Sequence, residues 1–448
     1  MKFGGTSVAD APAIIRFIEI VRSRIDQKPV VVVSALSQVT NILTEICAKS
    51  AEGNYERVVE LIEKLELRHT GLCEELFGKD NNRLQLAVTE IKEILSSIKE
   101  VTKAISFLKE ISDKRQAEII GTGELLSNIV VNHALNNAGI KCNKIFAREF
   151  IFTDNNYLKA KADQEMIIKK APGLIDLAFK DFQVVLTQGF ISTARDGNPS
   201  LLGREGSDLS ATLIGMAIGA QLIEIWTDVD GIHTTDPRRV ENTYSISEMS
   251  FNVAEELSVF GAKVLHPLTI EPARKKNIPV KVLNSRDASL QGTLIINHES
   301  VENRGIKSIT CKENVVVINI KSNESLSQHD FLNTLFRVLN KYKIKIDLAS
   351  ISQNNVELSF EDSLSQEDII NEISVFSTIF VNNSKSQVTV VGEDLKNSNG
   401  MMKNIFECMD DFTVEMVTGG SSDNSISFLV EKDQLNKIMQ VLHDKLFK

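Results

Sequence analysis

The chain has 448 residues, which is too long for a single hydrophobic core and indicates two or three domains. A hydrophobic fraction of 42% and a charged fraction of 25% are ordinary for a soluble globular protein. The formal net charge of −10 argues against general binding to nucleic acid or to anionic membranes. No apolar run approaches the ~20 residues of a membrane span and no signal peptide opens the chain, so we expect a cytoplasmic protein.

The cysteines and histidines predict no metal site. The cysteines are scattered, without the spacing of a metal knuckle or a redox motif, and we expect them to be free thiols in a reducing compartment. The seven histidines form no ligand pattern either.

Residues 1 to about 300 alternate short β-branched runs with helical stretches. A helix-like run over residues 10–26 follows the first glycines, and a long polar region between 53 and 110 predicts an antiparallel helical pair. Continuous Val and Ile runs suit strands that are buried on both faces, and the helices between them predict a largely parallel sheet. The expected strands are Val30–Ser34, Lys141–Phe146, Gln183–Gly189, Leu222–Thr227, Pro279–Leu283 and Thr293–Ile296.

The composition changes near Asn297–Gly305, and the tail repeats one order of elements, βαββαβ. The elements of the first copy are Val315–Ile320, Gln328–Tyr342, Ile344–Ser350, Asn355–Phe360, Gln366–Ser374 and Val375–Val381. Those of the second are Gln387–Val391, a helix around 399–410, Thr413–Val417, Ser425–Val430 and a final helix. The second copy lacks its last strand, and Ile306–Cys311 could fill that place. We therefore predict a domain of residues 1–300, a ferredoxin-like unit of residues 313–385, and a second unit of residues 305–312 plus 386–448.

The first residues, Lys2-Phe3-Gly4-Gly5-Thr6-Ser7, are suited to bind an anion. Without Cβ atoms, the backbone N–H groups of Gly4 and Gly5 can turn together toward an anion, and the next helix adds positive potential. Lys2 would supply a mobile point charge. Taken alone, a turn without a ligand explains this segment equally well.

Four further segments point to phosphate or carboxylate chemistry. Arg204 lies in a turn before a small apolar helix that Ser207 or Asp208 would cap, and its guanidinium could bind a carboxylate through two hydrogen bonds. The acidic run Trp226–Ile232 follows a strand, where open α/β sheets bind ligands. Glu124 and Lys263 each lie near a turn, but a helix-terminal charge and a solvated lysine are simpler interpretations.

Several familiar arrangements are absent from the sequence. There is no P-loop and no GxGxxG after the first strand, nor a Ser-His-Asp or HExxH arrangement. The glycine-rich segments are instead dispersed along the chain.

Taken together and in order, the segments resemble the aspartate kinases. They are KFGGTSV, VVVSALSQVTN, GTGELLS, LGREGSDLSATLIG, WTDVDGIHTTDPR and GAKVLHP. The tail resembles the paired ACT regulatory domains of that family, and the likeness covers essentially the whole chain. It implies an α/β amino-acid-kinase fold, with a mainly parallel central sheet between helices, plus two ferredoxin-like ACT units. It leaves no room for an appended homoserine dehydrogenase.

The resemblance also implies a reaction, with ATP and Mg²⁺ as cofactors. The family transfers a phosphoryl group from Mg-ATP to the side-chain carboxylate of L-aspartate, giving 4-phospho-L-aspartate. This step begins lysine, diaminopimelate, threonine and methionine synthesis. Lysine is the family-typical inhibitor, acting through the ACT pair, and a homodimer or a dimer of dimers through these domains is expected.

The motifs carry the family's site roles onto this sequence. In the catalytic roles, Lys2 holds the transferring phosphoryl group and Asp208 orients the lysine. In the aspartate pocket, Glu124 would bind the ammonium and Arg204 the α-carboxylate, and the other lining residues are Ser34, Thr40, Phe190 and Ser207. The nucleotide would contact Lys2, Gly4, Gly5, Ser7, Thr227, Asp228, His233, Arg238 and Lys263. The effector would contact Ser325, Asp330, Phe331, Leu332, Ile346 and Asp347. No residue is assigned as a metal ligand.

The sequence departs from the family pattern at a few positions. Lys2 leaves room for only a short first strand, and His233 stands where a tyrosine is frequent. Glu205 replaces a glycine of GRGGSD, and we predict that it points to solvent because an inward carboxylate would repel phosphate. In the effector region, Asp330 replaces a glycine and Gln353 a frequent glutamate.

Two alternatives remain at this stage. One is another amino-acid kinase, such as an acetylglutamate or glutamate 5-kinase, which the Arg204–Glu124 combination and the ACT pair disfavour. The other is an amino-acid-binding regulatory protein with a degenerate kinase domain. Lys2, Asp208, Asp228 and Lys263 are all present and argue against it.

Overall fold

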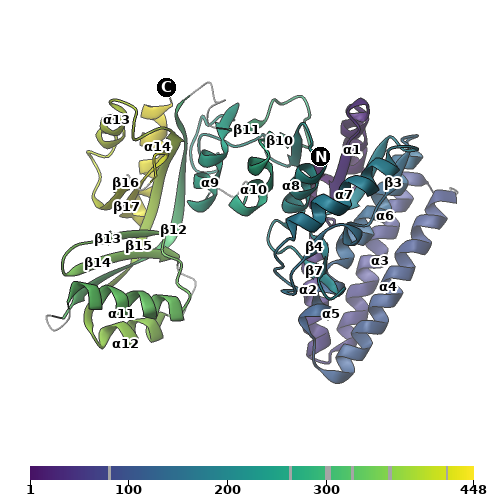
Figure 1. Ribbon diagram of the computed structural model, residues 1–448, viewed down its shortest axis with the longest axis horizontal. Helices are drawn as coiled ribbons and strands as arrows, with labels where there is room; N and C mark the ends of the chain where they lie inside the picture. The colour runs from purple at the N-terminus through teal and green to yellow at the C-terminus, as the bar shows by residue number, and fades with distance from the viewer. Residues whose placement is uncertain are drawn as a thin grey trace. The chain divides into compact units, whose positions relative to one another are not determined.

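The computed structural model describes residues 1–78, 82–261, 265–297, 304–323, 327–361, 366–419 and 422–447 (Figure 1). The chain divides into two compact units: unit 1 is Met1–Ile232 with Leu265–Asn297, and unit 2 is His233–Val264 with His298–Lys448. Residues 233–264 fall inside the predicted domain of residues 1–300 but group with the tail. The domain boundaries themselves stay predictions.

Unit 1 is built on a mainly parallel sheet. Within this unit the strand order is β3-β5-β2-β1-β8-β10-β11, and only the last pairing, β10 with β11, is antiparallel. The strands are β1 (Lys2–Phe3), β2 (Val30–Val33), β3 (Cys142–Lys144), β5 (Val184–Gln188), β8 (Ile223–Thr227), β10 (Val280–Asn284) and β11 (Thr293–Ile296). Each predicted strand is confirmed to within two residues at either end.

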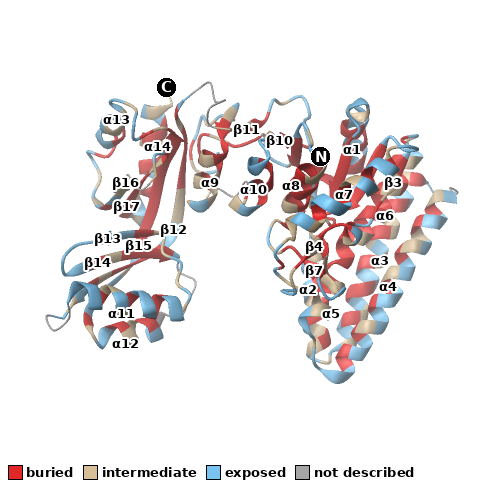
Figure 2. Cartoon of the chain, in the orientation of Figure 1, coloured by how far each residue is buried: buried red, intermediate tan, exposed pale blue. Residues whose placement is uncertain are grey.

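Helices flank this sheet and bury its apolar strands (Figures 1 and 2). They are α1 (Ala11–Arg22), α2 (Val39–Ala51), α3 (Tyr55–Phe77), α4 (Asn82–Leu108), α5 (Asp113–Ile120), α6 (Thr122–Asn137), α7 (Gln164–Ala178), α8 (Gly206–Ile218) and α10 (Pro267–Lys275). The long helices α3 and α4 pack along each other, which confirms the predicted helical pair. A small second sheet consists of β4 (Phe152–Thr153), β6 (Ile191–Ala194) and β7 (Pro199–Leu201).

The first strand is only two residues long, as expected, but it lies in the middle of the sheet. Lys2 pairs with Val32 of β2 on one side and with Ile225 of β8 on the other, both in parallel. Phe3 is fully buried, and its ring stacks on Trp226 with centroids 5.8 Å apart. Pairing on both sides and aromatic packing thus fix the backbone that carries Lys2.

Unit 2 contains one antiparallel sheet in the order β13-β14-β12-β15-β17-β16. The strands are β12 (Gly305–Ser322), β13 (Leu348–Ile351), β14 (Asn355–Glu361), β15 (Ser377–Glu393), β16 (Val414–Gly419) and β17 (Ser425–Glu431). The tail helices are α11 (Gln328–Lys341), α12 (Gln366–Ser374), α13 (Met401–Glu407) and α14 (Leu435–Leu446). Unit 2 also includes β9 (Glu248–Ser250) and α9 (Phe251–Val259).

Four predicted strands of the tail are in fact halves of two long ones, β12 and β15. The chain stays in the sheet across the predicted break, and the register shifts there between Lys312 and Val315. Asn314 adopts a left-handed backbone at this irregularity, with a φ of +54°. Gly305–Lys312, the first half of β12, pairs with Gln387–Glu393. This pairing agrees with the prediction that residues 305–312 complete the second ferredoxin-like unit.

One predicted strand of the tail begins too early. Strand β13 starts at Leu348 rather than at Ile344. Ile344 and Ile346 pack against the apolar cluster beneath α11, so these two residues are partly buried in a loop rather than in a strand.

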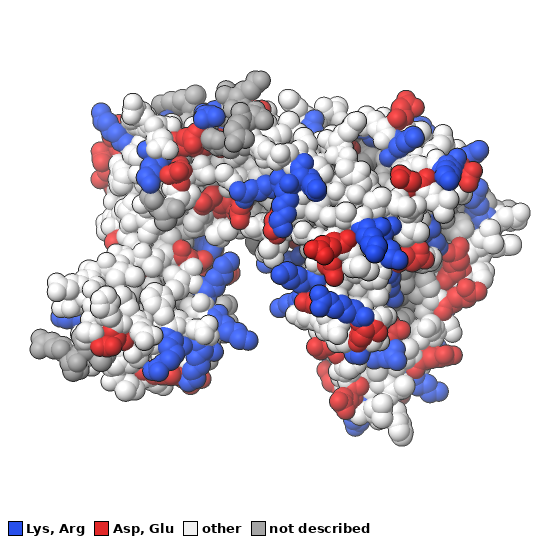
Figure 3. Space-filling model, in the orientation of Figure 1, with Lys and Arg blue, Asp and Glu red and all other residues white. Residues whose placement is uncertain are grey.

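The charged surface and the state of the cysteines agree with what the composition predicts. Acidic and basic side chains are interspersed over the visible face of each unit (Figure 3). All five cysteines are free, and four of them are buried. Within the described ranges, no helix is both long and apolar enough to cross a membrane.

The apolar cluster that α11 covers in unit 2 yields a stability prediction. Phe331 is 1% exposed and meets the Phe376 ring edge-on at 6.3 Å. We expect Phe331→Ala to lower the free energy of unfolding of unit 2 by about 3–5 kcal/mol, since a large buried ring is lost. Urea denaturation measures this, with Phe336→Ala on the exposed side of the same helix as the control. Equal effects of the two substitutions would contradict this account of the core.

Candidate active site

The predicted catalytic residues of unit 1 gather at the carboxyl ends of parallel strands. Strands β1, β2, β5, β8 and β10 all run in one direction, so the loops that follow them meet at one edge of the sheet. Open α/β sheets bind their ligands at this edge. Helices that lead into such strands also begin there, and their first N–H groups face the same region.

An ion pair joins Lys2 to Asp208 at the centre of this edge. The Lys2 Nζ lies 2.7 Å from Asp208 Oδ1, and the two side chains are only 10% and 11% exposed. Asp208 is in the first turn of α8, where a carboxylate is also favoured by the helix dipole. The structure therefore brings together two residues that lie 206 positions apart in the sequence and fixes the direction of the lysine charge.

The glycine loop after β1 packs closely on the loop after β2. A Cβ on Gly5 would lie 2.6 Å from the carbonyl oxygen of Ala35, so only glycine fits there without a shift. The carbonyl of Gly5 accepts a hydrogen bond from the Ser37 N–H at 3.1 Å. The two loops are thus held at backbone contact.

The predicted anion cradle needs one correction. The Gly4 N–H does not point toward an open anion site, because it donates to the carbonyl of Trp226 at 3.2 Å. Ser7 Oγ donates to Ser285 Oγ at 2.7 Å and lies 3.4 Å from the same carbonyl. These contacts tie the glycine loop to the ends of β8 and β10.

Glu124 is a buried carboxylate with one unused oxygen. It lies in the first turn of α6, it is 3% exposed, and its Oε1 accepts the Ala35 N–H at 3.2 Å. Its Oε2 is buried without a hydrogen-bond partner in the described part of the chain. Burial raises the pKa of Glu124 to about 8, against the opposing effect of the Ala35 N–H. A buried, unpaired carboxylate of this kind is suited to bind an ammonium group.

The turn before α8 brings Phe190 and Ser207 together. The Phe190 N–H donates to Ser210 Oγ at 2.9 Å, and Phe190 has a φ of +66°. A Cβ on Gly189 would lie 2.5 Å from Ser207 Cβ, so glycine permits the close packing of these segments. Arg204 is exposed, and it makes no hydrogen bond or ion pair with the residues that the structure describes.

Two expectations about this turn are wrong. The N-cap of α8 is Glu205, whose side chain makes no capping bond, whereas Ser207 and Asp208 lie inside the first turn of the helix. Nor does Glu205 project freely into solvent. It is half-buried, and its Oε2 accepts the backbone N–H of His266 at 2.5 Å. The reason is that the start of α10 offers an unsatisfied N–H within reach.

The remaining predicted residues of unit 1 lie in the same set of loops. Ser34 directly follows β2, and its N–H donates to the Phe3 carbonyl at 3.2 Å. Thr40 is half-buried in the first turn of α2. Thr227 ends β8, and the carboxylate of Asp228 lies 3.7 Å from Arg286.

The other predicted nucleotide contacts fall in the 233–264 segment of unit 2. The His233 carbonyl accepts the Ser308 hydroxyl at 2.9 Å. Arg238 is largely exposed, and its guanidinium forms two hydrogen bonds with Asp236, at 2.9 and 2.7 Å. Lys263 lies outside the described residues. The nucleotide-binding roles of these three side chains therefore stay predictions.

The predicted effector residues differ in what they offer a ligand. Ser325 lies outside the described residues, whereas Asp330 accepts the Ser327 hydroxyl at 2.6 Å near the start of α11. The Phe331 side chain is buried in the core, and the predicted contact of Phe331 with the effector stays a prediction. Leu332 and Ile346 are partly buried against the same cluster.

Asp347 is the one buried acid of this effector set in the described chain. Its side chain is 5% exposed, and its Oδ1 lies 2.5 Å from Nζ of Lys312, which is 14% exposed. Its Oδ2 is buried without a hydrogen-bond partner among the described residues. An internal ammonium thus already faces the carboxylate that the family pattern assigns to the effector.

The structure adds site residues that the sequence did not indicate. Ser285 and Ser210 hydrogen-bond to the glycine loop and to Phe190, and Ala35 acts through its backbone N–H and carbonyl. Backbone groups carry no residue signature, so Ala35 could not be found from sequence. Ser285 lies two residues after the predicted strand Pro279–Leu283, and that position was an available signal.

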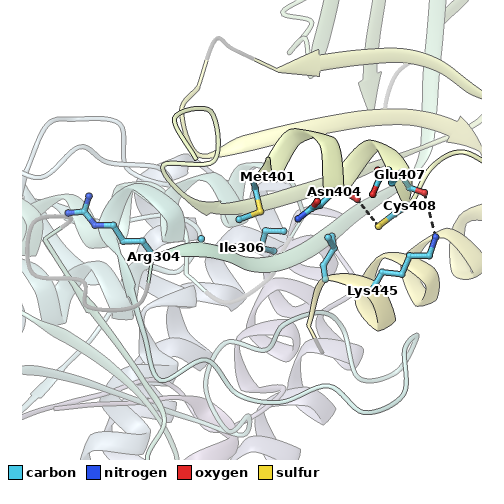
Figure 4. A pocket seen from close by; sticks show the side chains of 9 residues that line it. Arg304, Ile306, Met401, Asn404, Glu407, Cys408 and Lys445 are labelled. Atoms are coloured by element: carbon cyan, nitrogen blue, oxygen red, sulfur yellow. Dashed lines mark hydrogen bonds between the residues drawn. The ribbon is translucent and has the colours of Figure 1, made fainter. Parts of the chain in front are cut away.

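A separate pocket of about 510 Å³ lies within unit 2 (Figure 4). It lies between the start of β12 and helices α13 and α14, with Arg304 and Lys445 at opposite ends. Lys445 donates to the Glu407 carbonyl at 3.5 Å. None of the predicted effector residues lines this pocket, so it is distinct from the predicted effector site.

The comparisons with known proteins agree with this geometry. Residues 1–284 match the amino acid kinase family, and residues 388–446 match an ACT domain. The chain is therefore an amino acid kinase with a C-terminal ACT region, which confirms the predicted fold class.

Relatives that align over the full length of the chain identify the family within the amino acid kinases. The chain is 30% identical to lysine-sensitive aspartokinase 3 of Escherichia coli (strain K12) over 462 aligned residues, covering all of this chain and 98% of that protein. It is 29% identical to the aspartokinase of Chlamydia trachomatis, covering 97% of it. The structure of E. coli aspartokinase III in complex with aspartate and ADP superposes with a TM-score of 0.84 over 100% of this chain and 99% of that one, at 30% identity. The chain belongs to the aspartokinase family, as its motifs predicted.

The buried acid at the start of α6 yields a pH prediction. The pKa of Glu124 is about 8 in the folded state against 4.5 in the unfolded state, so the folded state holds the proton more tightly. Its contribution to stability is complete below pH 4.5 and is lost as the pH rises toward 8, with a loss on the order of 3 kcal/mol by pH 7. Glutamine cannot ionise, so Glu124→Gln should increasingly exceed the wild type in ligand-free melting temperature between pH 5 and 8. A constant difference over that range would contradict the assignment.

Proposed function

We propose that the protein transfers the γ-phosphoryl group of ATP to the side-chain carboxylate of L-aspartate and releases ADP and 4-phospho-L-aspartate. The observation that carries this proposal is the buried Lys2–Asp208 pair, with the unpaired Glu124 oxygen in the first turn of α6 at the same edge of the sheet. A cation suits a transferring phosphoryl group, and a buried carboxylate suits the ammonium of an amino acid. The E. coli relative, whose structure holds aspartate and ADP, supports the same pair of ligands.

The reaction needs no protein base. The attacking carboxylate of aspartate is already ionised at neutral pH, so catalysis consists of positioning and charge neutralisation of an in-line transfer. Lys2 would neutralise the charge that builds up on the phosphoryl oxygens. Asp208 would hold the lysine in one direction, so that little reorganisation is needed during the transfer.

Selectivity for a free amino acid would come from charges of both signs. Glu124 would receive the substrate ammonium at Oε2, and Arg204, which has no partner among the described residues, would bind the α-carboxylate. An N-acetylated substrate has no ammonium and would leave the Glu124 carboxylate uncompensated. This disfavours acetylglutamate as the acceptor.

Magnesium fits this site only as a companion of the nucleotide. No group of three or more metal-ligating side chains occurs among the described residues, so the protein offers no cage of its own. Mg²⁺ is commonly held by substrate phosphates together with one or two carboxylates and water. Asp228, at the end of β8, is the acid best placed to assist, and the ion would supply neutralisation of the polyphosphate charge.

The charge of Lys2 yields a prediction for activity. We expect Lys2→Met to lower kcat by about 10²–10³, because one preorganised charge contact to the transition state is lost. A coupled ADP-release assay with Mg-ATP and L-aspartate measures this, with Lys114→Met, at a half-buried lysine outside the proposed site, as the control. Retained turnover in the Lys2 variant would overturn the mechanism. Turnover of the wild type with glutamate or acetylglutamate but not with aspartate would assign another amino-acid kinase.

We further propose that lysine inhibits the enzyme through the first predicted ACT unit, residues 313–385. The structure of E. coli aspartokinase III in complex with lysine and aspartate supports lysine as the effector, with a TM-score of 0.84 and 31% identity. In this chain the effector ammonium would approach Asp347, whose charge Lys312 already balances. Two ammonium groups on one buried carboxylate repel each other, so Lys312 would weaken the binding of lysine.

Removal of that internal ammonium tests the effector site. We expect Lys312→Met to lower the lysine concentration for half-inhibition by about tenfold, because Asp347 is then free for the effector. Lys345→Met is the matched control, since Lys345 is exposed and makes no ion pair with Asp347. Unchanged or weaker inhibition in a folded Lys312 variant would remove Asp347 from the effector site.

Assembly through the ACT region completes the proposal. Strand β13 is the last strand at one edge of the sheet, and Ile351 at its end is 47% exposed. We propose that two chains associate along the ACT sheets as a dimer, or as a dimer of dimers, in the cytoplasm. Lysine would then stabilise the less active arrangement through its differential affinity for two states.

A further inference from the structure

Glu205 occupies an unusual backbone position at the edge of the candidate site. It is the N-cap of α8, directly between Arg204 and the first turn that holds Ser207 and Asp208, and its φ is +53°. Side chains with a Cβ are disfavoured in this left-handed region, which glycine adopts freely. A glutamate at this position therefore needs a side-chain contact that compensates for the cost of the left-handed backbone.

That contact reaches the start of a second helix. The Oε2 of Glu205 accepts the backbone N–H of His266, the N-cap of α10, at 2.5 Å. Further along both helices, Thr212 Oγ1 of α8 donates to the Thr269 carbonyl in the first turn of α10 at 2.5 Å. The carboxylate lies at the positive ends of two helix dipoles, which stabilises its charge and offsets the backbone cost. The two helices are thus joined at their first turns by a side chain that a glycine could not supply.

The topology places this link between two functional regions. Helix α8 leads into β8 and α10 leads into β10, and these strands are parallel neighbours, so both helices begin at the ligand-binding edge. The α8 turn carries the residues proposed for aspartate and for orienting Lys2. The β10 end carries Ser285, which holds the Ser7 hydroxyl of the proposed phosphate loop. If α10 moved away from α8, the end of β10 and the proposed phosphate loop would be displaced more than the aspartate-binding residues of the α8 turn.

We propose that Glu205 is a positioning residue that holds the start of α10 against the Arg204–Asp208 turn and thereby sets the nucleotide side of the site. The inference rests on the proposed kinase function but concerns a residue outside the proposed catalytic and binding set. The essential group is the acceptor oxygen and not the negative charge, because the partner is a neutral backbone N–H.

Two substitutions separate the oxygen from the charge. Glu205→Gln keeps an acceptor oxygen at the same position, and Glu205→Ala removes it. We expect Glu205→Ala to raise the KM for ATP about fivefold to tenfold, with the KM for aspartate within about twofold of the wild type, as loss of one such hydrogen bond would do. Glu205→Gln should restore the wild-type KM for ATP. Glu271→Ala, at an exposed acid on α10 that pairs with Lys275, controls for loss of a carboxylate from this helix.

A second readout does not depend on turnover. Hydrogen–deuterium exchange of a peptide that begins at or before residue 264 and ends at 271 reports the protection of the His266 amide. It should quicken in the ligand-free Glu205→Ala protein and not in Glu205→Gln. If the wild type proves inactive toward aspartate, the exchange result still tests the link, so failure of the function and failure of the inference can be told apart.

Three results would overturn the inference. One is unchanged exchange and an unchanged KM for ATP in Glu205→Ala. The second is a lower KM for ATP in both variants, which would make Glu205 a repulsive charge facing the phosphates. The third is an equal rise of both KM values together with a lower melting temperature, which would mean a general structural role.

Discussion

The ion pair between Lys2 and Asp208 depends on a strand of only two residues that is held between β2 and β8. Because Phe3 is buried against Trp226, the backbone of Lys2 cannot turn away from the sheet, and the lysine side chain meets α8 at its first turn. The proposed aspartate-binding residues and the glycine loop lie at the same edge of the sheet as this charge. The short N-terminal strand is therefore compatible with a rigid site, since pairing on both sides substitutes for length.

Two buried carboxylates with unused oxygens mark the proposed ligand sites of the two units. Glu124 in unit 1 and Asp347 in unit 2 each keep one oxygen without a partner among the described residues. Glu124 has no cation near it, and burial raises its pKa, whereas Asp347 is balanced by Lys312. Both sites would thus recognise an ammonium group, but burial disfavours the charge of Glu124, whereas an internal ammonium already balances the charge of Asp347.

Much of this organisation could be predicted from the sequence. The buried Val and Ile runs located every expected strand of the parallel sheet, because such runs have few other stable environments. The tail was harder to predict, since Lys312–Asn314 is polar and reads as a loop, yet the chain passes through it as an irregular strand. The contacts of Gly4 and Glu205 were also predicted incorrectly. Both depend on backbone groups of distant segments, Trp226 and His266, that carry no sequence signature.

The account depends most on Lys2 and Asp208 acting as one unit in phosphoryl transfer. A double-mutant cycle of Lys2→Met and Asp208→Asn, read as kcat with Mg-ATP and L-aspartate, tests this directly. If Asp208 acts by orienting Lys2, its substitution should cost little further activity once Lys2 is gone, so the double variant should resemble Lys2→Met alone. Losses that multiply independently would contradict the account and give the two residues separate roles.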